Sequence, residues 1–194
     1  MRQLFRRLPA PTSSRNWSLS TTRWSSNNGQ ECTVNELHDQ VAAAVEEFKF
    51  PVIVHDHSTF DLPVLSPKDV SRTLGIPLGR ITKSILLQQK SGTRLVLAVC
   101  PIDRRIDMAS ISRHLGLGRL EVAGEDSVSK KCGYQRLGVS PLGLPRDIVV
   151  VIDTSLMAHS TVVVGGGNVG VEVELSPWDL AEACDGQNVE ITDG

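Results

Sequence analysis

A lysine occupies an apolar stretch that reads as a β-strand. In the run I-T-K-S-I-L-L, strand alternation puts Lys83 on the same face as Ile81, Ile85 and Leu87. Taking an ammonium group out of water beside aliphatic side chains is costly unless an anion or a set of carbonyl groups meets it. We therefore expect Lys83 to face a ligand. The alternative is a lysine at the sheet edge whose stem packs while its head reaches water.

A glycine-rich loop is the second feature that can do chemistry. The run G-Y-Q-R-L-G-V-S-P-L-G contains Gly138, Pro141 and Gly143 around Ser140, just before a predicted strand. Glycine permits conformations in which successive N–H groups converge on one oxygen, and proline stiffens the turn. The loop predicts a site that polarises a carbonyl group, and an ordinary connection is the alternative. The run G-G-G-N around Gly166 is a weaker candidate, because it lies between two predicted strands like a hairpin turn.

Acidic and histidine side chains complete the candidates. Glu172 and Glu174 lie on the polar face of a predicted strand, where we expect solvated carboxylates that gain a role only close to Lys83. His55 and His57 flank a loop without a third partner at the spacing of a metal site. The four cysteines are isolated and no G-x-S-x-G motif is present. The sequence therefore predicts no bound metal or other cofactor, and it does not favour a Ser-His-Asp triad.

The first 30 residues differ in composition from the rest. They contain five arginines, many serines and threonines and no acidic residue. This composition is typical of a transit peptide, so we expect import into the mitochondrial matrix or, alternatively, a plastid. A disordered tail is the other interpretation. We expect one domain over residues 31–194, and no apolar run is long enough for a membrane span.

The charge of that domain limits its partners. The whole chain carries −2 and residues 1–30 carry +5, which leaves −7 for the remainder. Nonspecific affinity for nucleic acid depends on basic side chains that neutralise phosphates. A domain this acidic cannot rely on a broad basic surface for such binding. Aromatic residues are only 4% of the chain, too few for repeated base stacking. We expect no DNA partner, and any bound RNA is held over a small part of its length.

Helices and strands interleave along the domain, and several strands follow each other as hairpins. A capping box at Thr33 and Glu36 opens the first expected helix, and Ser66 followed by Pro67 opens the second. Helices are expected at 33–48, 66–74, 107–115, 125–132 and 176–186. Strands are expected at 52–55, 81–88, 93–100, 119–122, 148–152, 160–164 and 169–175. The pattern predicts a mixed α/β fold, in which a curled, barrel-like sheet is surrounded by helices.

Four blocks, taken in order, resemble the YbaK/ProX family of aminoacyl-tRNA deacylases. They are LGIPLGRITKSILL, LVLAVCPIDRRIDMASISRHLG, GYQRLGVSPLGLPRDIVVVID and VVVGGGNVGVEVELSPWDLAEAC, within residues 50–184. The resemblance implies a pocket for the 3′ terminal aminoacyl-adenosine of tRNA, hydrolysis of its ester without a metal, and an aminoacyl-tRNA synthetase as a further partner. It implies catalytic roles for Lys83 and Gly138. The substrate-binding residues that follow from it and from the loops are His55, Ser84, Leu137, Val139, Ser140, Pro141, Gly143, Gly166 and Glu172.

One position departs from the family pattern. Where the family loop usually has Gly-Gly or Gly-Thr, this chain has Leu137 before Gly138. A side chain there would intrude into the pocket and narrow it, or would remove a backbone geometry needed for catalysis. The expected function is therefore hydrolysis of mischarged tRNA that bears a small amino acid. The alternatives are a non-catalytic module that binds a tRNA end or a nucleotide, and an unrelated ester or amide hydrolase.

Overall fold

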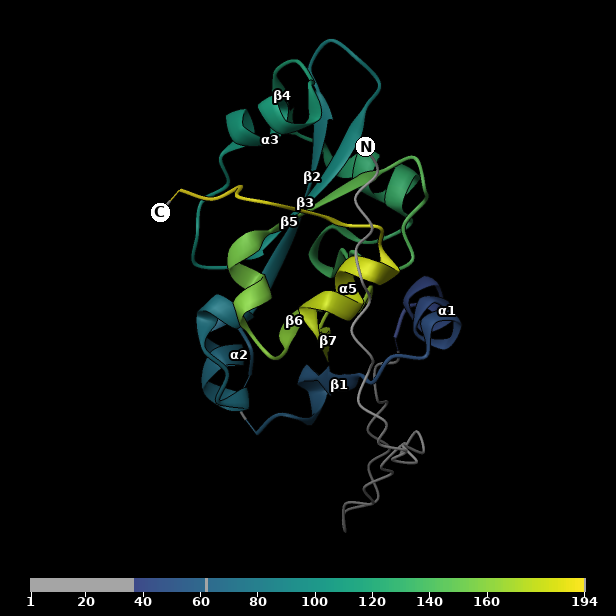
Figure 1. The fold of residues 1–194 in the computed structure, drawn as a ribbon. Coiled ribbons are helices and arrows are strands. Elements are labelled where there is room, and N and C mark those ends of the chain that lie inside the picture. Colours follow the sequence, from purple (N-terminus) through teal and green to yellow (C-terminus); the bar gives the residue numbers. More distant parts are fainter. Residues whose placement is uncertain (1–36, 62, 194) are drawn as a thin grey trace, which may run out of the picture. The chain divides into compact units, whose positions relative to one another are not determined.

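The computed structural model describes residues 37–61 and 63–193 (Figure 1). The predicted transit peptide or tail, residues 1–30, lies outside the described residues, as do the predicted capping residues Thr33 and Glu36. Contacts group Cys32–Gly194 into one compact unit. Its helices are α1 (Asp39–Phe48), α2 (Pro67–Leu74), α3 (Met108–Leu115), α4 (Glu125–Ser127) and α5 (Pro177–Ala183). Its strands are β1 (Ile53–Asp56), β2 (Thr82–Gln89), β3 (Leu95–Pro101), β4 (Leu120–Val122), β5 (Val149–Asp153), β6 (Val162–Gly165), β7 (Val171–Leu175) and β8 (Gln187–Val189).

The strands form two sheets, so the mixed α/β class is confirmed but the sheet is not closed as a barrel. One sheet has the order β1-β7-β6 and is antiparallel throughout. The other has the order β4-β2-β3-β5-β8, in which β5 runs parallel to β3 and to β8. A single parallel bridge between Ile81 and Val163 joins the two sheets. Apart from that bridge β2 and β6 belong to different sheets.

Strand β3 lies in the middle of the larger sheet, as its apolar sequence predicts. All its residues after Leu95 are buried, because both faces are covered. Leu97 and Val99 pack into a large apolar cluster that also holds Val41 of α1. Val96 and Ala98 point into a second cluster on the opposite face. The sheet is therefore a rigid support for side chains at its edges.

Helices α1 and α2 cover opposite faces of the smaller sheet (Figure 1). Val41 of α1 packs in the large cluster with Val164 and Val173. Val70 of α2 packs in a third cluster with Val163. The face that α2 only partly covers carries the polar side chains of β1 and β7.

Most helix ends follow their predicted capping residues. Ser66 and Pro67 begin α2, and Gly75 ends it with a φ of +65°. Two predictions need correction. Helix α1 begins only at Asp39, where His38 caps it and donates its backbone N–H to Gly166 O at 3.1 Å. The helix expected over 125–132 is one short α-turn followed by a π-helical turn at Val128–Cys132.

Strand β8 was not predicted, because it is short and sits in a polar stretch. Val189 is its buried residue, and the strand adds in parallel to the edge of β5. The buried carboxylate of Asp153 fixes the segment beyond it. Asp153 accepts hydrogen bonds from Ile191 N at 3.1 Å and from Thr192 Oγ1 at 3.0 Å. No helix in the described part of the chain is long and apolar enough to cross a bilayer.

Candidate active site

Several candidate residues lie on strands β2, β6 and β7, near the bridge between the two sheets. Ile81 and Val163 are bridged and pack in the same cluster, so they mark one continuous face across β2 and β6. Two residues further along each strand, the same face carries Lys83 on β2 and Gly165 on β6. Glu172 of β7 stands opposite Gly165. We call this region, formed by Lys83, Gly165, Glu172, His55 and the 136–139 turn, the seam.

The polar face of the smaller sheet is an ordered network around Glu174. His55 Nε2 lies 3.0 Å from Glu174 Oε2, and Arg80 Nη2 donates to Glu174 Oε1 at 2.8 Å. The Thr161 hydroxyl also donates to Glu174. Burial would raise the pKa of Glu174, but these hydrogen bonds and the neighbouring positive charge lower it below its usual value. Glu174 is therefore an ionised anchor that fixes His55 and Arg80.

Glu172 lies on the same face but in a different state. Its side chain is 23% exposed and accepts no hydrogen bond from the described residues, and its nearest ionic partner is His57 Nε2 at 3.9 Å. Burial raises the pKa of Glu172 to about 7. The expectation that Glu172 and Glu174 are solvated was wrong, because both lie on a half-covered sheet face rather than a free one.

His57 follows β1 and was not selected from the sequence as a site residue. Its backbone N–H donates to Gly170 O at 2.9 Å, which places the imidazole beside the β6–β7 turn. His57 Nε2 is buried without a hydrogen-bond partner in the described part of the chain. Burial lowers the pKa of His57, against the charge of Asp56. Only the H-D-H pattern hinted at this position, and it gives no sign of Glu172 more than a hundred residues away.

The Lys83 ammonium group donates to backbone carbonyl groups. Its position in an apolar strand required either such carbonyls or an anion. Its Nζ donates to Ile102 O at 3.3 Å and to Arg104 O. An ammonium group has three donors, so one remains for a ligand. Lys83 thus ties the loop that follows β3 to the edge of β2 and keeps a positive charge at the seam.

The 136–139 turn forms the backbone wall of the seam. Gly138 is buried and closes a short 3₁₀ turn (Arg136–Gly138), in which its N–H donates to Gln135 O at 2.9 Å. A Cβ atom on Gly138 would lie 2.7 Å from Gly167 O, so only glycine allows this approach. The Gly138 amide is thus already used. The next amide, that of Val139, has no backbone acceptor among the described residues.

The second half of the loop faces inward. Ser140 is fully buried and its Oγ accepts the N–H of Leu142 at 3.2 Å. Pro141 is also buried. Gly143 has a φ of +67°, and its carbonyl accepts from Gln40 Nε2 at 3.1 Å. These residues, predicted to line the pocket, support the turn by packing it against α1.

Three further residues predicted to bind the substrate differ in exposure and in their hydrogen bonds. Leu137 is 82% exposed, and its predicted narrowing of the pocket stays a prediction. Gly166 uses both backbone groups, since its N–H donates to Val171 O and its carbonyl accepts from His38 N. Ser84 Oγ is buried and has no hydrogen-bond partner within residues 37–61 and 63–193. Ser84 lies on the strand face of Leu86, which shares a cluster with Val139.

The candidate residues include a backbone amide without a backbone acceptor (Val139), an ammonium group (Lys83) and a carboxyl group whose pKa burial raises (Glu172), whereas Ser84 lies on the opposite face of β2 from Lys83. No group of three or more His, Cys, Asp or Glu side chains suited to a metal ion occurs in the described part of the chain. Such an arrangement can polarise a carbonyl oxygen through N–H groups and bind a cationic group beside it. A nucleophilic side chain with its own base is not part of the set.

Comparisons with known proteins show which proteins this chain is similar to. The family model described as "Aminoacyl-tRNA editing domain" matches residues 62–183. A protein of Enterococcus faecalis named "Putative Cys-tRNA(Pro)/Cys-tRNA(Cys) deacylase EbsC" is 28% identical over 149 residues, which are 76% of this chain and 89% of that protein. The "Prolyl-tRNA editing protein ProX" of Acetoanaerobium sticklandii is 27% identical over 144 residues, 72% of this chain and 85% of that protein. The crystal structure of the hypothetical protein APE2540 superimposes with a TM-score of 0.71 at 23% identity, over 80% of this chain and all of that one.

Proposed function

This chain belongs to the aminoacyl-tRNA editing domain family, and from that premise we propose that it hydrolyses the ester bond of mischarged aminoacyl-tRNA. The observation that carries the proposal is the seam itself. A buried glycine turn presents a backbone amide without a backbone acceptor, and to it we add Lys83 on β2 and the desolvated carboxyl group of Glu172 on β7. An ester of an amino acid on a ribose has the complementary groups: a carbonyl oxygen, an α-ammonium group and a phosphate.

The backbone turn supplies the stabilisation of negative charge. As the ester carbonyl is attacked, its oxygen becomes an oxyanion, and the N–H of Val139 is the donor that the structure leaves for it. Removing one such donor typically costs about a hundred- to a thousand-fold in rate. In this mechanism Gly138 allows the turn to pack closely against Gly167. The amide of the next residue, Val139, binds the oxyanion.

Water is the nucleophile in this mechanism. We assign no side chain as the general base, because Glu174 is held by His55 and Arg80 and we assign Glu172 to the α-ammonium group of the substrate. The proton of the attacking water passes to a group of the substrate, such as the free ribose hydroxyl or the side chain of the amino acid. Lys83 contributes its charge and its remaining donor to the terminal nucleotide or to the developing negative charge.

Glu172 gives the site its selectivity for an aminoacyl group. A buried carboxylate without an ionic partner is costly, and a cation that binds next to it recovers that cost. The α-ammonium group of an aminoacyl ester is such a cation. Glu172 therefore binds the substrate in its ionised form and orients the carbonyl group toward the turn.

The substrate is a tRNA charged with an amino acid smaller than the correct one, in the manner of Cys-tRNA(Pro) or Ala-tRNA(Pro). A synthetase pocket gains only about 1 to 3 kcal/mol from one methylene, which is too little for accurate rejection of smaller amino acids. A second site that removes the errors solves this problem. The names of the two relatives, a Cys-tRNA deacylase and a prolyl-tRNA editing protein, support this substrate class. A prolyl-tRNA synthetase is the partner that such trans-editing favours.

A panel of mischarged tRNAs tests the function. The protein is incubated with tRNA(Pro) bearing cysteine, alanine or proline, and release of the labelled amino acid is followed in single turnover. We expect hydrolysis of one of the smaller esters and sparing of the prolyl ester. Lys83→Ala is expected to slow the reaction at least about tenfold, because it removes the positive charge and the hydrogen bonds that hold the loop after β3. Lys90→Ala, in the exposed turn of the same hairpin, is the matched control.

The same panel separates the enzyme from a non-catalytic module that binds a tRNA end. Binding of charged tRNA with no release above the rate in buffer would establish the module and refute the enzyme. The module is considered because Leu137 stands where the family loop usually has glycine. The family match and the names of the two relatives favour the enzyme.

A further inference from the structure

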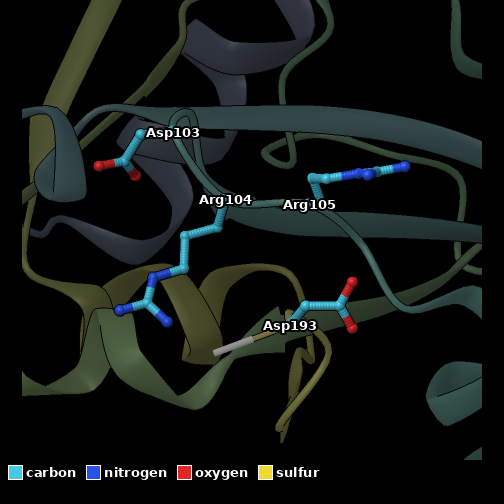
Figure 2. Close-up of a pocket in the computed structure, with 4 residues that line it drawn as sticks. All are labelled: Asp103, Arg104, Arg105 and Asp193. Carbon is cyan, nitrogen blue, oxygen red and sulfur yellow. The ribbon is translucent and has the colours of Figure 1, made fainter.

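A surface pocket lies next to Lys83 on the loop that follows β3. It has a volume of about 310 Å³ and is lined by Asp103, Arg104, Arg105 and Asp193 (Figure 2). Because Lys83 Nζ donates to the carbonyl of Arg104, the pocket begins directly beside the seam. Its volume suits part of a nucleotide rather than a single ion.

The two arginines of this pocket are uncommitted. None of the ion pairs or side-chain hydrogen bonds in the described part of the chain involves Arg104 or Arg105, although two carboxylates line the same pocket. Figure 2 shows the two guanidinium groups leaving the loop in different directions. Side chains that diverge in this way meet two separate anionic groups more easily than one. Successive phosphates of a nucleic acid strand are such groups.

The backbone under these arginines is held from two sides. On one side Lys83 binds the carbonyls of Ile102 and Arg104. On the other, the segment after β8 pairs with the loop: Asp193 N donates to Arg105 O at 3.1 Å, and Ile106 forms a bridge with Thr192. The pocket is therefore preorganised, which lowers the entropy cost of binding.

We propose that this pocket binds the phosphate backbone of the unpaired 3′ strand of an RNA, one step beyond the nucleotide held at the seam. The proposal rests on the proposed function for the identity of the strand. In a domain whose net charge is −7, the two uncommitted arginines, together with Lys83 bound to the same loop, bring three cations to one region against the two carboxylates of the pocket, so a polyanion can bind there. The carboxylates of Asp103 and Asp193 accept hydrogen bonds from ribose hydroxyls and base amino groups, which favours RNA over DNA.

Binding of uncharged RNA tests the proposal independently of hydrolysis. The probes are an RNA hairpin with a short unpaired 3′ end, the same hairpin with a blunt end, and the DNA version of the first. The full chain carries Arg104→Gln and Arg105→Gln together. The matched control carries Arg94→Gln and Arg146→Gln, two exposed arginines, the first at the far end of the β2–β3 hairpin. Circular dichroism checks that both double variants fold.

We expect the Arg104/Arg105 variant to lose about tenfold in affinity for the hairpin with the unpaired end, whereas the control variant binds as the unmodified protein does. The slope of log K against log salt is expected to fall by about 1.4, the value for two phosphate contacts to a single strand. Hydrolysis of a minimal aminoacyl-adenosine ester should be unchanged, because it lacks those phosphates.

Several results would overturn the proposal: no binding of the unpaired RNA by the unmodified protein, equal losses in both double variants, equal losses on the blunt and the unpaired hairpins, or equal binding of DNA. None of these depends on ester hydrolysis. A failure of the mischarged-tRNA panel would instead refute the proposed function, and the binding result would still stand by itself.

Discussion

At the scale of single residues, neighbouring carboxylates on one strand have opposite properties. Glu172 and Glu174 are two positions apart on the same face of β7. Three polar partners lower the pKa of Glu174, whereas burial without a hydrogen bond raises that of Glu172 to about 7. Pairs of titratable groups whose environments push their pKa values apart mark functional sites. Glu174, with its three polar partners, holds the structure, and Glu172, which accepts no hydrogen bond from the described residues, is available to the substrate.

Replacement of Glu172 by glutamine tests this division through the pH dependence of the rate. In the unmodified protein, kcat/KM is expected to fall as pH drops through about 7, because the protonated carboxyl group no longer attracts the α-ammonium group. Glu172→Gln is expected to be slower at pH 8 by about tenfold and to lack this acidic limb. Glu190→Gln, at an exposed position, should keep the profile of the unmodified protein. An unchanged acidic limb in Glu172→Gln would assign the titration to another group.

The same variant has a predicted effect on stability. Between its usual pKa of 4.5 and the folded value of about 7, Glu172 binds more protons in the folded protein than in the unfolded chain. Stability contributed at this position therefore falls as pH rises through that window. Glu172→Gln should match the unmodified protein near pH 4.5 and exceed it at pH 8 by up to about 3 kcal/mol, measured by urea denaturation.

At the scale of elements, the seam depends on a turn that approaches another turn closely. Gly138 faces the backbone of Gly167 and Asn168, and Gly165 faces the carbonyl of Val139. The 136–139 turn therefore occupies the space where β2 and β6 separate. Its position, and with it the direction of the Val139 amide, is fixed by contacts that only glycine permits.

Gly138→Ala should displace this turn. The new Cβ atom would lie 2.7 Å from Gly167 O and 3.0 Å from Asn168 C, both backbone atoms that cannot rotate away. We expect a loss of about 1 to 3 kcal/mol in unfolding free energy. We also expect a fall in kcat of about a hundredfold with little change in KM, because a misplaced donor acts mainly on the transition state. Gly124→Ala, where a Cβ atom meets nothing within 4 Å, is the control. A normal kcat in Gly138→Ala would show that the turn's backbone takes no part in catalysis.

Elements with strong local signals were predictable from the sequence, and elements fixed by distant contacts were not. Ser66-Pro67 begins α2 as predicted, and the helix expected from Asp107 is found with Asp107 as its cap, because the proline ring and the Asp107 carboxylate act within one turn. The π-helical turn at Val128–Cys132 and strand β8 have no such local signal. The same distinction applies to the site. Lys83 stands out in its own strand, whereas the state of Glu172 depends on β1 and β6, which lie far away in the chain.

At the scale of the whole molecule, the sequence is divided by charge. The first 30 residues carry +5 and the remainder carries −7. We propose that residues 1–30 direct import into the mitochondrial matrix, with a plastid as the alternative, and that residues 31–194 form the editing domain. An acidic domain that holds RNA by one small basic pocket does not need the basic stretch for binding.

A fusion of residues 1–30 to a fluorescent reporter tests the import proposal. We expect the reporter to accumulate in mitochondria, because an arginine-rich and acid-free segment is driven by the negative potential of the matrix. The control replaces the five arginines of this segment with glutamine and should remain in the cytosol. A diffuse signal from the unmodified fusion would contradict the proposal, and a signal in plastids would select its alternative.

The family match begins at residue 62, so strand β1 stands before it. Yet β1 brings His55 to Glu174 and pairs in register with Glu172, the residue we assign to the aminoacyl group. A segment outside the family match thereby supports residues that lie within it. Exchanging the segment around β1 between relatives would therefore change the support of Glu172 and Glu174 while leaving the 136–139 turn and Lys83 untouched.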